Sequence, residues 1–212
     1  MIPMQILRLL VALLLVLSVT PTRAETLQNH FASVFLSGEK IGSVHFTTRH
    51  DAGGVLQELK TRSSLSIFGR EVYHYSLHTH ELWEEGNMKR LWGTANENGV
   101  RYQIELDREP GGYSGILNGQ AVELPANSFP TAVWHYAITQ HTTLFSLPQL
   151  NLLNVNVKKS EDSLVIGETK VDAEKYKFTG DWKATIWFDS DGQFLKWQYK
   201  VKGRTVTVVL DP

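Results

Sequence analysis

The sequence predicts a mainly β protein, an antiparallel meander of roughly a dozen strands that curls into a barrel, half-barrel or β-roll. Three observations support this fold class. Runs rich in aromatic and β-branched residues alternate apolar with polar positions, glycine-containing turn signals separate them at short intervals, and residues 128–140 alone have strong helical spacing. We therefore expect one helix packed on a sheet.

The N-terminus, residues 1–24, has the features of a secretory signal peptide. Arg8 precedes an unbroken apolar run from Leu9 to Leu17, and Thr22-Arg23-Ala24 precede a polar chain. A membrane anchor is the alternative, but the run is shorter than the ~20 residues that a helical span requires. We predict cleavage after Ala24, a periplasmic location, one β-rich domain over residues 25–212, and no membrane span after cleavage.

Charge and composition exclude several functions. The chain has 21 basic and 22 acidic residues, and loss of Arg8 and Arg23 with the signal leaves 19 basic residues and a net charge near −3. Nucleic acid and anionic membrane surfaces are therefore poor candidate partners. The chain contains no cysteine, which excludes disulfide bonds and cysteine catalysis. Nothing in the sequence indicates a cofactor.

The first strands follow from alternation and turn signals. We expect a hairpin of residues 28–36 and 41–49 around the turn 37–40, and then a strand from Val55 to Phe68 with one wet face. Residues 71–83 form the next strand. Its inner and outer faces separate cleanly: Tyr73, Tyr75, Leu77, Glu81 and Trp83 share one face, and His74, His78 and His80 share the other.

Two hairpins fix the expected registers in the middle of the chain. Asn98-Gly99 is a strong type I′ signal, and it pairs residues 102, 104 and 106 with residues 95, 93 and 91. A four-residue loop over 84–87 would pair Trp83 with Met88 and place Glu81 opposite Arg90, in a buried ion pair beside Trp92. The two registers place Arg90 on opposite faces. A bulge within residues 88–95, or burial of both faces, would reconcile them.

The inserted helix is predicted over residues 128–140. Asn127 or Ser128 is a candidate cap, and Pro130 suits a first turn. The apolar stripe of the helix would lie against the sheet. Short strands precede it at 113–117 and 121–124, and the strands after it are expected at 150–158, 163–168, 171–179, 182–189, 194–201 and 204–210.

Catalytic and metal sites are not predicted. His74 and His78 are about 13 Å apart along a strand, which is too far for one ion with bonds of ~2 Å. His78 and His80 would need further ligands, so we assign the histidines to a solvated face. The chain has no G-x-S-x-G nucleophile elbow and no other local frame for a catalytic nucleophile.

A ligand pocket is the favoured functional feature. Six tryptophans fit either a filled β core or an apolar cavity beneath the helix. Glu81 lies among aromatic residues, where it is either a structural ion-pair partner or a polar anchor for a ligand. The candidate ligand-binding residues are Glu81, Trp83, Arg90, Trp92, Phe129, Trp134, His135 and Phe145.

Six stretches occur in the order seen in a bacterial family, and the chain resembles the domain of unknown function 6134. They are F-L-S-G-E-K-I-G-S-V-H-F (35–46), Y-H-Y…E-L-W…G (73–86), T-A-N-E-N-G (94–99), S-F-P-T-A-V-W-H (128–135), Y-K-F-T-G (176–180) and I-W-F-D-S-D-G (186–192). The resemblance implies an exported, non-enzymatic β-rich domain, similar in outline to half-barrels that carry lipids or lipoproteins across the periplasm. Members often have Trp-Asn where this chain has Trp134-His135.

Three functional hypotheses remain open at this point. The first is a periplasmic protein that binds or carries an apolar ligand such as a lipid between the curved sheet and the helix. The second is a structural or assembly factor that binds another envelope protein through its sheet. The third is a hydrolase that uses His135 or a buried carboxylate.

Overall fold

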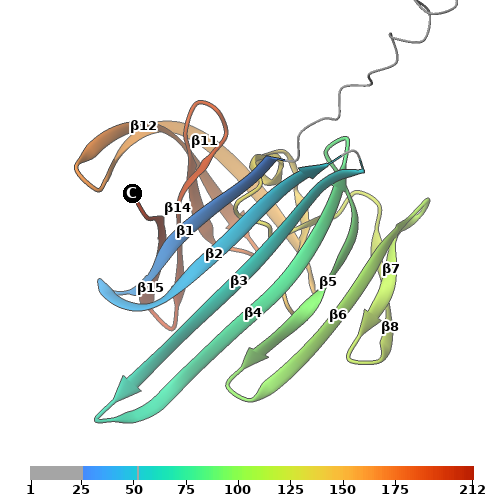
Figure 1. Cartoon of the computed structure of the whole chain (residues 1–212), viewed down its shortest axis with the longest axis horizontal. Coiled ribbons are helices and arrows are strands. Elements are labelled where there is room, and N and C mark those ends of the chain that lie inside the picture. The colour runs from blue at the N-terminus through green and yellow to red at the C-terminus, as the bar shows by residue number, and fades with distance from the viewer. Residues whose placement is uncertain (1–25, 52) are drawn as a thin grey trace, which may run out of the picture.

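The computed structural model describes residues 26–51 and 53–212, and the predicted signal peptide lies outside these ranges. The described residues form one sheet of 15 strands (Figure 1). No helix within them is long and apolar enough to cross a membrane. The strands are β1 (Thr26–Leu36), β2 (Glu39–Asp51), β3 (Gly54–Ile67), β4 (Arg70–Glu84), β5 (Asn87–Glu97), β6 (Val100–Glu109), β7 (Gly112–Leu117), β8 (Gln120–Pro125), β9 (Phe129–Pro130), β10 (Thr143–Phe145), β11 (Leu152–Ile166), β12 (Thr169–Gly180), β13 (Ala184–Phe188), β14 (Phe194–Val201) and β15 (Arg204–Leu210).

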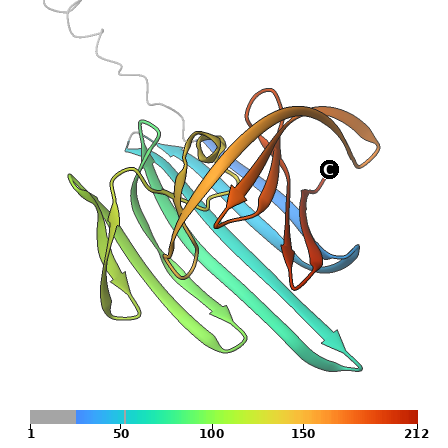
Figure 2. The same ribbon diagram turned by 180° about the vertical axis from the view of Figure 1, so that it is seen from behind.

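The sheet is a curled meander that does not close. Its strand order runs β8 to β1 and then β15 down to β9, so β8 and β9 are its two edges. Most neighbouring strands are consecutive in sequence and antiparallel, whereas β1 pairs with β15 and β9 pairs in parallel with β10. The strands curve around a common interior (Figures 1 and 2). The mainly β meander is thus confirmed, in an open form.

The inner face of the sheet carries the core, as β4 illustrates. Leu77, Thr79, Glu81 and Trp83 are buried, and His78 between them is exposed. This alternation is expected for a strand with one buried and one solvent-exposed face, because successive side chains point to opposite faces of the sheet. The predicted facing of β4, with the glutamate inside and the histidines outside, is confirmed.

The hairpin registers were predicted correctly at one turn and only in part at the other. Asn98-Gly99 joins β5 to β6 with positive φ at both residues, and Leu91 pairs with Leu106 as expected. Between β4 and β5 the loop has two residues, and Trp83 does pair with Met88. The register then shifts, so Arg90 faces Leu82 rather than Glu81. A β-bulge causes this correction, because it inserts one extra residue into β5.

The predicted helix over 128–140 is wrong. This stretch contains the two-residue strand β9 and then η1, a single 3-10 turn at Tyr136–Gln140. Residues 126–151, which we call the inner segment, run inside the curve of the sheet (Figure 2). Its apolar residues recur because the segment is enclosed on several sides, and Phe129 pairs with Leu144 instead of making helical bonds. Tertiary contacts here override a helical pattern.

Candidate functional site

A cavity of about 600 Å³ lies between the inner segment and the sheet. Strands β1 to β4, β14 and β15 supply most of its wall, and one side of the inner segment supplies a further part. The remaining lining residues are Glu97, Asn98, Leu153, Trp182 and Lys202. The wall is largely apolar because these strands turn their aliphatic positions inward. Representative lining residues are Ala32, Val34, Leu59, Leu77, Val133 and Val208.

Neutral polar groups are also present on the cavity wall. Tyr73, Tyr75 and Tyr199 line it, and burial raises the pKa of the Tyr75 and Tyr199 hydroxyls above their ordinary value. The ring of Trp197 stacks on Tyr199 at 4.4 Å between centroids, and its buried Nε1 has no hydrogen-bond partner. The wall therefore offers phenol and indole groups without a formal charge.

The cavity opens at one end of the sheet. Lys202 and Arg204, beside the β14–β15 turn, line it and are exposed, as is Asn98 at the β5–β6 turn. We call this the hairpin end, because the β1–β2, β3–β4, β5–β6, β7–β8 and β14–β15 turns all lie there. Toward the other end, Phe46 meets Phe194 edge to face at 6.2 Å. Glu97, next to Asn98, also lines this end, so the mouth has two basic side chains and one acidic one, and the floor is aromatic.

The other side of the inner segment forms a filled region that we call the packed compartment. There the His135 ring stacks on Trp83 at 4.3 Å, and Phe129 contacts Trp83 at 5.3 Å. Phe145 is completely buried and meets Tyr113 edge to face. Aromatic pairs of this kind stabilise a core beyond their buried area.

Glu81 is buried in this compartment, with 1 % of its surface exposed. Trp83 Nε1 donates a hydrogen bond to its Oε2 at 3.1 Å, and the Trp134 indole also favours the charged form, although Oε1 has no partner at hydrogen-bond geometry. Desolvation outweighs both indoles and raises the pKa of Glu81 to about 8. The side chain is therefore a neutral acid at pH 7, and it does not need a cationic partner.

His135 is held as a neutral ring. Burial, aided by the nearby His141, lowers its pKa to about 4. Its Nδ1 accepts a hydrogen bond from the amide of Ala137 at 3.2 Å, which caps the 3-10 turn. Stacking and capping give this histidine a structural role in the compartment.

The structure separates the eight predicted ligand-binding residues into three groups. Trp134 lines the cavity, whereas Glu81, Trp83, Phe129, His135 and Phe145 lie together in the packed compartment. Arg90 and Trp92 lie on the outer face.

On that outer face, Arg90 pairs with Asp107 at 3.5 Å and Trp92 stacks on His80. The prediction missed Tyr75 and Tyr199 as cavity residues. Their inward positions were readable from period two, but which strands would face each other across the interior was not.

One group of three among the described residues could hold a metal ion, namely Glu58, His78 and His80 on the outer face. Glu58 Oε1 lies 2.7 Å from His78 Nε2 and 3.4 Å from His80 Nε2. Lys60 Nζ lies 2.7 Å from the same oxygen. Lys60, the largest favourable influence, and His78 hold the pKa of Glu58 at about 2. His74 instead lies near Glu71.

Fold and site together define an open, β-barrel-like protein with an apolar cavity. The chain belongs to the family described as domain of unknown function DUF6134, which matches residues 33–211. It is similar to the crystal structure of a β-barrel-like protein of domain of unknown function DUF1849 from Brucella abortus, with 9 % identity and a TM-score of 0.58. That alignment covers 88 % of this chain and 95 % of the other. No curated protein matches the chain.

Proposed function

We propose that this protein is an exported carrier that binds an amphiphile with one apolar chain, such as a fatty acid or a single-chain lipid, in the cavity. The observation that carries the proposal is the cavity itself, whose volume of about 600 Å³ lies within the usual range for small-molecule sites. A largely apolar wall whose interior the protein's own side chains do not fill favours a ligand with apolar surface to bury.

The ends of the cavity orient such a ligand. The apolar chain would extend toward Phe46 and Phe194, and the head group would remain at the mouth. Lys202 and Arg204 outnumber Glu97 there, so a carboxylate or phosphate head group is favoured. The wall hydroxyls of Tyr75 and Tyr199 can form hydrogen bonds with neutral polar atoms, such as ester oxygens, that link a head group to its chain.

Neighbouring serines on β3 give a matched test. Ser63 is buried and lines the cavity, whereas Ser64 is exposed on the other face. Ser63→Phe should fill part of the cavity, and Ser64→Phe makes the same chemical change outside it. We expect only Ser63→Phe to lose copurified amphiphile in native mass spectrometry and to weaken binding of a fluorescent fatty acid at least tenfold.

Thermal unfolding of both variants checks that the fold is intact. Equal retention of amphiphile by Ser63→Phe and Ser64→Phe would contradict a ligand in this cavity. So would a wild-type protein that neither carries an amphiphile nor binds the fluorescent fatty acid.

Export is part of the same proposal, and it rests on the short apolar run and on Ala24. The N-terminal residue of the protein isolated from the cell envelope tests it. We expect Glu25, and an intact N-terminus would contradict cleavage.

A further inference from the structure

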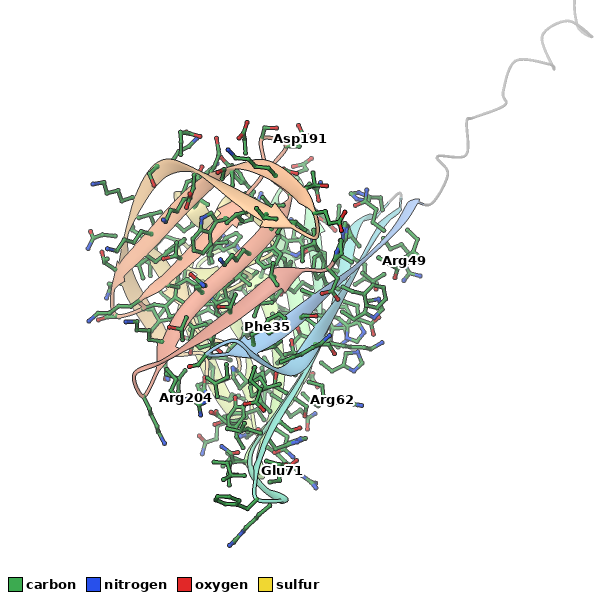
Figure 3. The ribbon with its side chains drawn as sticks, turned by 90° about the vertical axis from the view of Figure 1, so that its left-hand side faces the viewer. Phe35, Arg49, Arg62, Glu71, Asp191 and Arg204 are labelled. Atoms are coloured by element: carbon green, nitrogen blue, oxygen red, sulfur yellow. The ribbon has the colours of Figure 1, made fainter. Side chains whose placement is uncertain are left out.

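The β3–β4 hairpin extends beyond both of its neighbours. The last pair between β2 and β3 is Gly42 with Ser63, and the first between β4 and β5 is Tyr75 with Glu97. Residues 64–74 therefore project as a two-stranded finger, and Figure 3 shows Glu71 at its far tip, beyond Arg62 and Arg204. Phe68 occupies the turn with a relative exposure of 104 %. A fully exposed phenylalanine at a projecting tip has no partner within the described chain.

Exposed apolar side chains are more frequent toward this end of the sheet. Of the ten large hydrophobic residues that are exposed in the described chain, three lie on the finger and four lie at or near other strand ends of the hairpin end, and two of these seven, Val72 and Val201, line the cavity. Large apolar patches on a soluble surface commonly mark an interaction site. The seven are Ile67, Phe68, Val72, Val100, Ile116, Leu152 and Val201.

Charge at the same end is opposite in sign to that of the whole chain. The turns at 37–40, 68–71, 97–101 and 200–204 carry six basic residues and three acidic ones, a local excess of +3 in a chain of net charge −1. The overall balance, which made an anionic membrane a poor candidate partner, conceals this asymmetry. The basic residues are Lys40, Arg70, Arg101, Lys200, Lys202 and Arg204.

We propose that the hairpin end docks on an anionic membrane surface, with Phe68 inserted between head groups and the cavity mouth facing the lipid. Aromatic side chains insert at the boundary of head groups and acyl chains, and nearby basic residues attract acidic lipids. This inference extends the proposed carrier function, because an amphiphile could pass between bilayer and cavity without crossing water. Docking itself does not require a ligand in the cavity.

Vesicle sedimentation tests docking directly. The exported form, residues 25–212, contains every described strand and lacks the apolar run of the leader. We expect it to bind vesicles of phosphatidylglycerol and phosphatidylcholine, to bind phosphatidylcholine alone much more weakly, and to dissociate as salt is raised. Phe68→Asp should weaken binding at least tenfold. Val165→Asp is the matched control, since Val165 is 69 % exposed at the opposite end, and it should bind as wild type.

Two results would overturn docking: no sedimentation with anionic vesicles, or equal binding by Phe68→Asp and wild type. Self-association in sedimentation velocity that Phe68→Asp abolishes, without vesicle binding, would assign the end to a second copy and also overturn it. Ligand content separates this inference from the carrier function. Phe68 does not line the cavity, so Phe68→Asp should keep its amphiphile, and vesicle binding by a protein without any amphiphile would contradict the carrier alone.

A second inference rests on the independent cluster of Glu58, His78 and His80. His78 and His80 are two apart on β4 and so share a face, and Glu58 of β3 pairs directly with His80. Their ligand atoms all lie within 4.8 Å of one another. Tetrahedral zinc with bonds of ~2.0–2.1 Å holds its ligand atoms about 3.3 Å apart, so small side-chain rotations suffice.

We infer that these three side chains bind a divalent transition-metal ion such as Zn²⁺, with a further coordination position open to water. Two imidazoles and one carboxylate form a ligand set that zinc and its neighbours accept. The Lys60 ammonium, 2.7 Å from Glu58 Oε1, competes with the metal for that oxygen. Metal binding must therefore displace Lys60.

Titration calorimetry with Zn²⁺ and the visible spectrum of added Co²⁺ test this site. We expect one equivalent to bind, His80→Ala to weaken binding at least tenfold, and Lys60→Met to strengthen it because the competing cation is gone. His74→Ala is the control on the same face of β4 and should change nothing. Absence of saturable binding, equal binding by His80→Ala, or weaker binding by Lys60→Met would overturn the inference.

Discussion

The packed compartment and the cavity lie on opposite sides of one inner segment, within one curled sheet. In the compartment Phe129, His135 and Phe145 fill the space against β4 and β7, and the interior is dense. On the cavity side Val133 and Trp134 face the aliphatic wall without filling it. The difference shows that the inner segment determines which part of the interior is packed with side chains and which part is a cavity. Its side chains, rather than the strands, set that boundary.

The largest expected effect compares one substitution on the two sides. Leu106 is completely buried in the core of β6, whereas Leu77 lines the cavity from β4. Leu106→Ala should lower the free energy of unfolding by roughly 3–5 kcal/mol, because it leaves a new void in dense packing. Leu77→Ala should cost about half as much, since its side chain already lacks neighbours on one side. Urea unfolding measures both, and equal losses would mean that the cavity is filled.

The second prediction uses Glu81 and His135, whose pKa values are shifted in opposite directions by desolvation. Glu81 has its pKa raised from 4.5 to about 8, so the folded state binds a proton that the unfolded state releases between those values. Stability should therefore fall as pH rises across that range. His135 has its pKa lowered from 6.5 to about 4, so its contribution has the opposite sign and is lost as pH falls below 6.5.

The two effects oppose each other below pH 6.5, and Glu81 acts without His135 above it. We expect a nearly level stability from pH 4.5 to 6.5 and then a loss of roughly 1.5 kcal/mol by pH 8. Glu81→Gln should abolish the loss of stability above pH 6.5. Below pH 6.5 the stability of this variant should rise with pH, because only the contribution of His135 remains. Chemical denaturation at half-unit pH intervals gives both curves. A stability of Glu81→Gln that still falls above pH 6.5 would contradict a neutral Glu81.

Trp134 marks the boundary between the two regions, because it lines the cavity and also interacts with Glu81. Trp134→Phe keeps an aromatic ring but removes the indole N–H, which is not at hydrogen-bond geometry to Glu81, so we expect a loss of less than about 1 kcal/mol of stability. The pKa of Glu81 should rise further, because that donor favours the carboxylate. A shift of the pH-stability curve toward higher pH would show it. An unchanged curve would mean that Trp134 acts on the cavity alone.

The smallest expected effect lies outside both regions. Arg90 pairs with Asp107 on the outer face, with 48 % of its side chain exposed. Exposed ion pairs contribute little, so Arg90→Ala should change stability by less than about 0.5 kcal/mol and leave ligand content unaltered. A large loss of stability would instead support the predicted ion pair between Arg90 and Glu81.

Local signals predicted the strands well, since each depends on residues close in sequence. Period two gave the correct inner position of Glu81, and Asn98-Gly99 gave the correct register of β5 on β6. The prediction for Arg90 failed because a bulge moves every later residue by one position. The conflict between the two hairpin registers predicted either a bulge within residues 88–95 or burial of both faces, and the structure confirms the bulge.

The inner segment could not be predicted because its conformation depends on distant partners. Phe129 and Phe145 have ordinary apolar spacing, yet β9 and β10 form only where the curled sheet encloses them. The pair Tyr136 and Glu174, which are 38 residues apart, fixes the 3-10 turn to β12 through a 2.8 Å hydrogen bond. Of the eight predicted ligand-binding residues only Trp134 lines the cavity, and Tyr75 and Tyr199 were missed. The division of the aromatic residues between a filled and a hollow side could not be predicted from the sequence.

The pairing of β1 with β15 joins strands that lie far apart in the sequence. Every other pairing among the described strands joins strands that are consecutive in sequence, so those pairings need only local contacts. Ala32 of β1 pairs with Leu210 of β15. Ser33 Oγ donates a hydrogen bond to Asp211 Oδ1 at 2.7 Å and stabilises this contact. Without this pairing the described strands form two separate meanders, each with an additional unpaired edge. The wall of the cavity, which both meanders share, is therefore complete only when β15 pairs with β1.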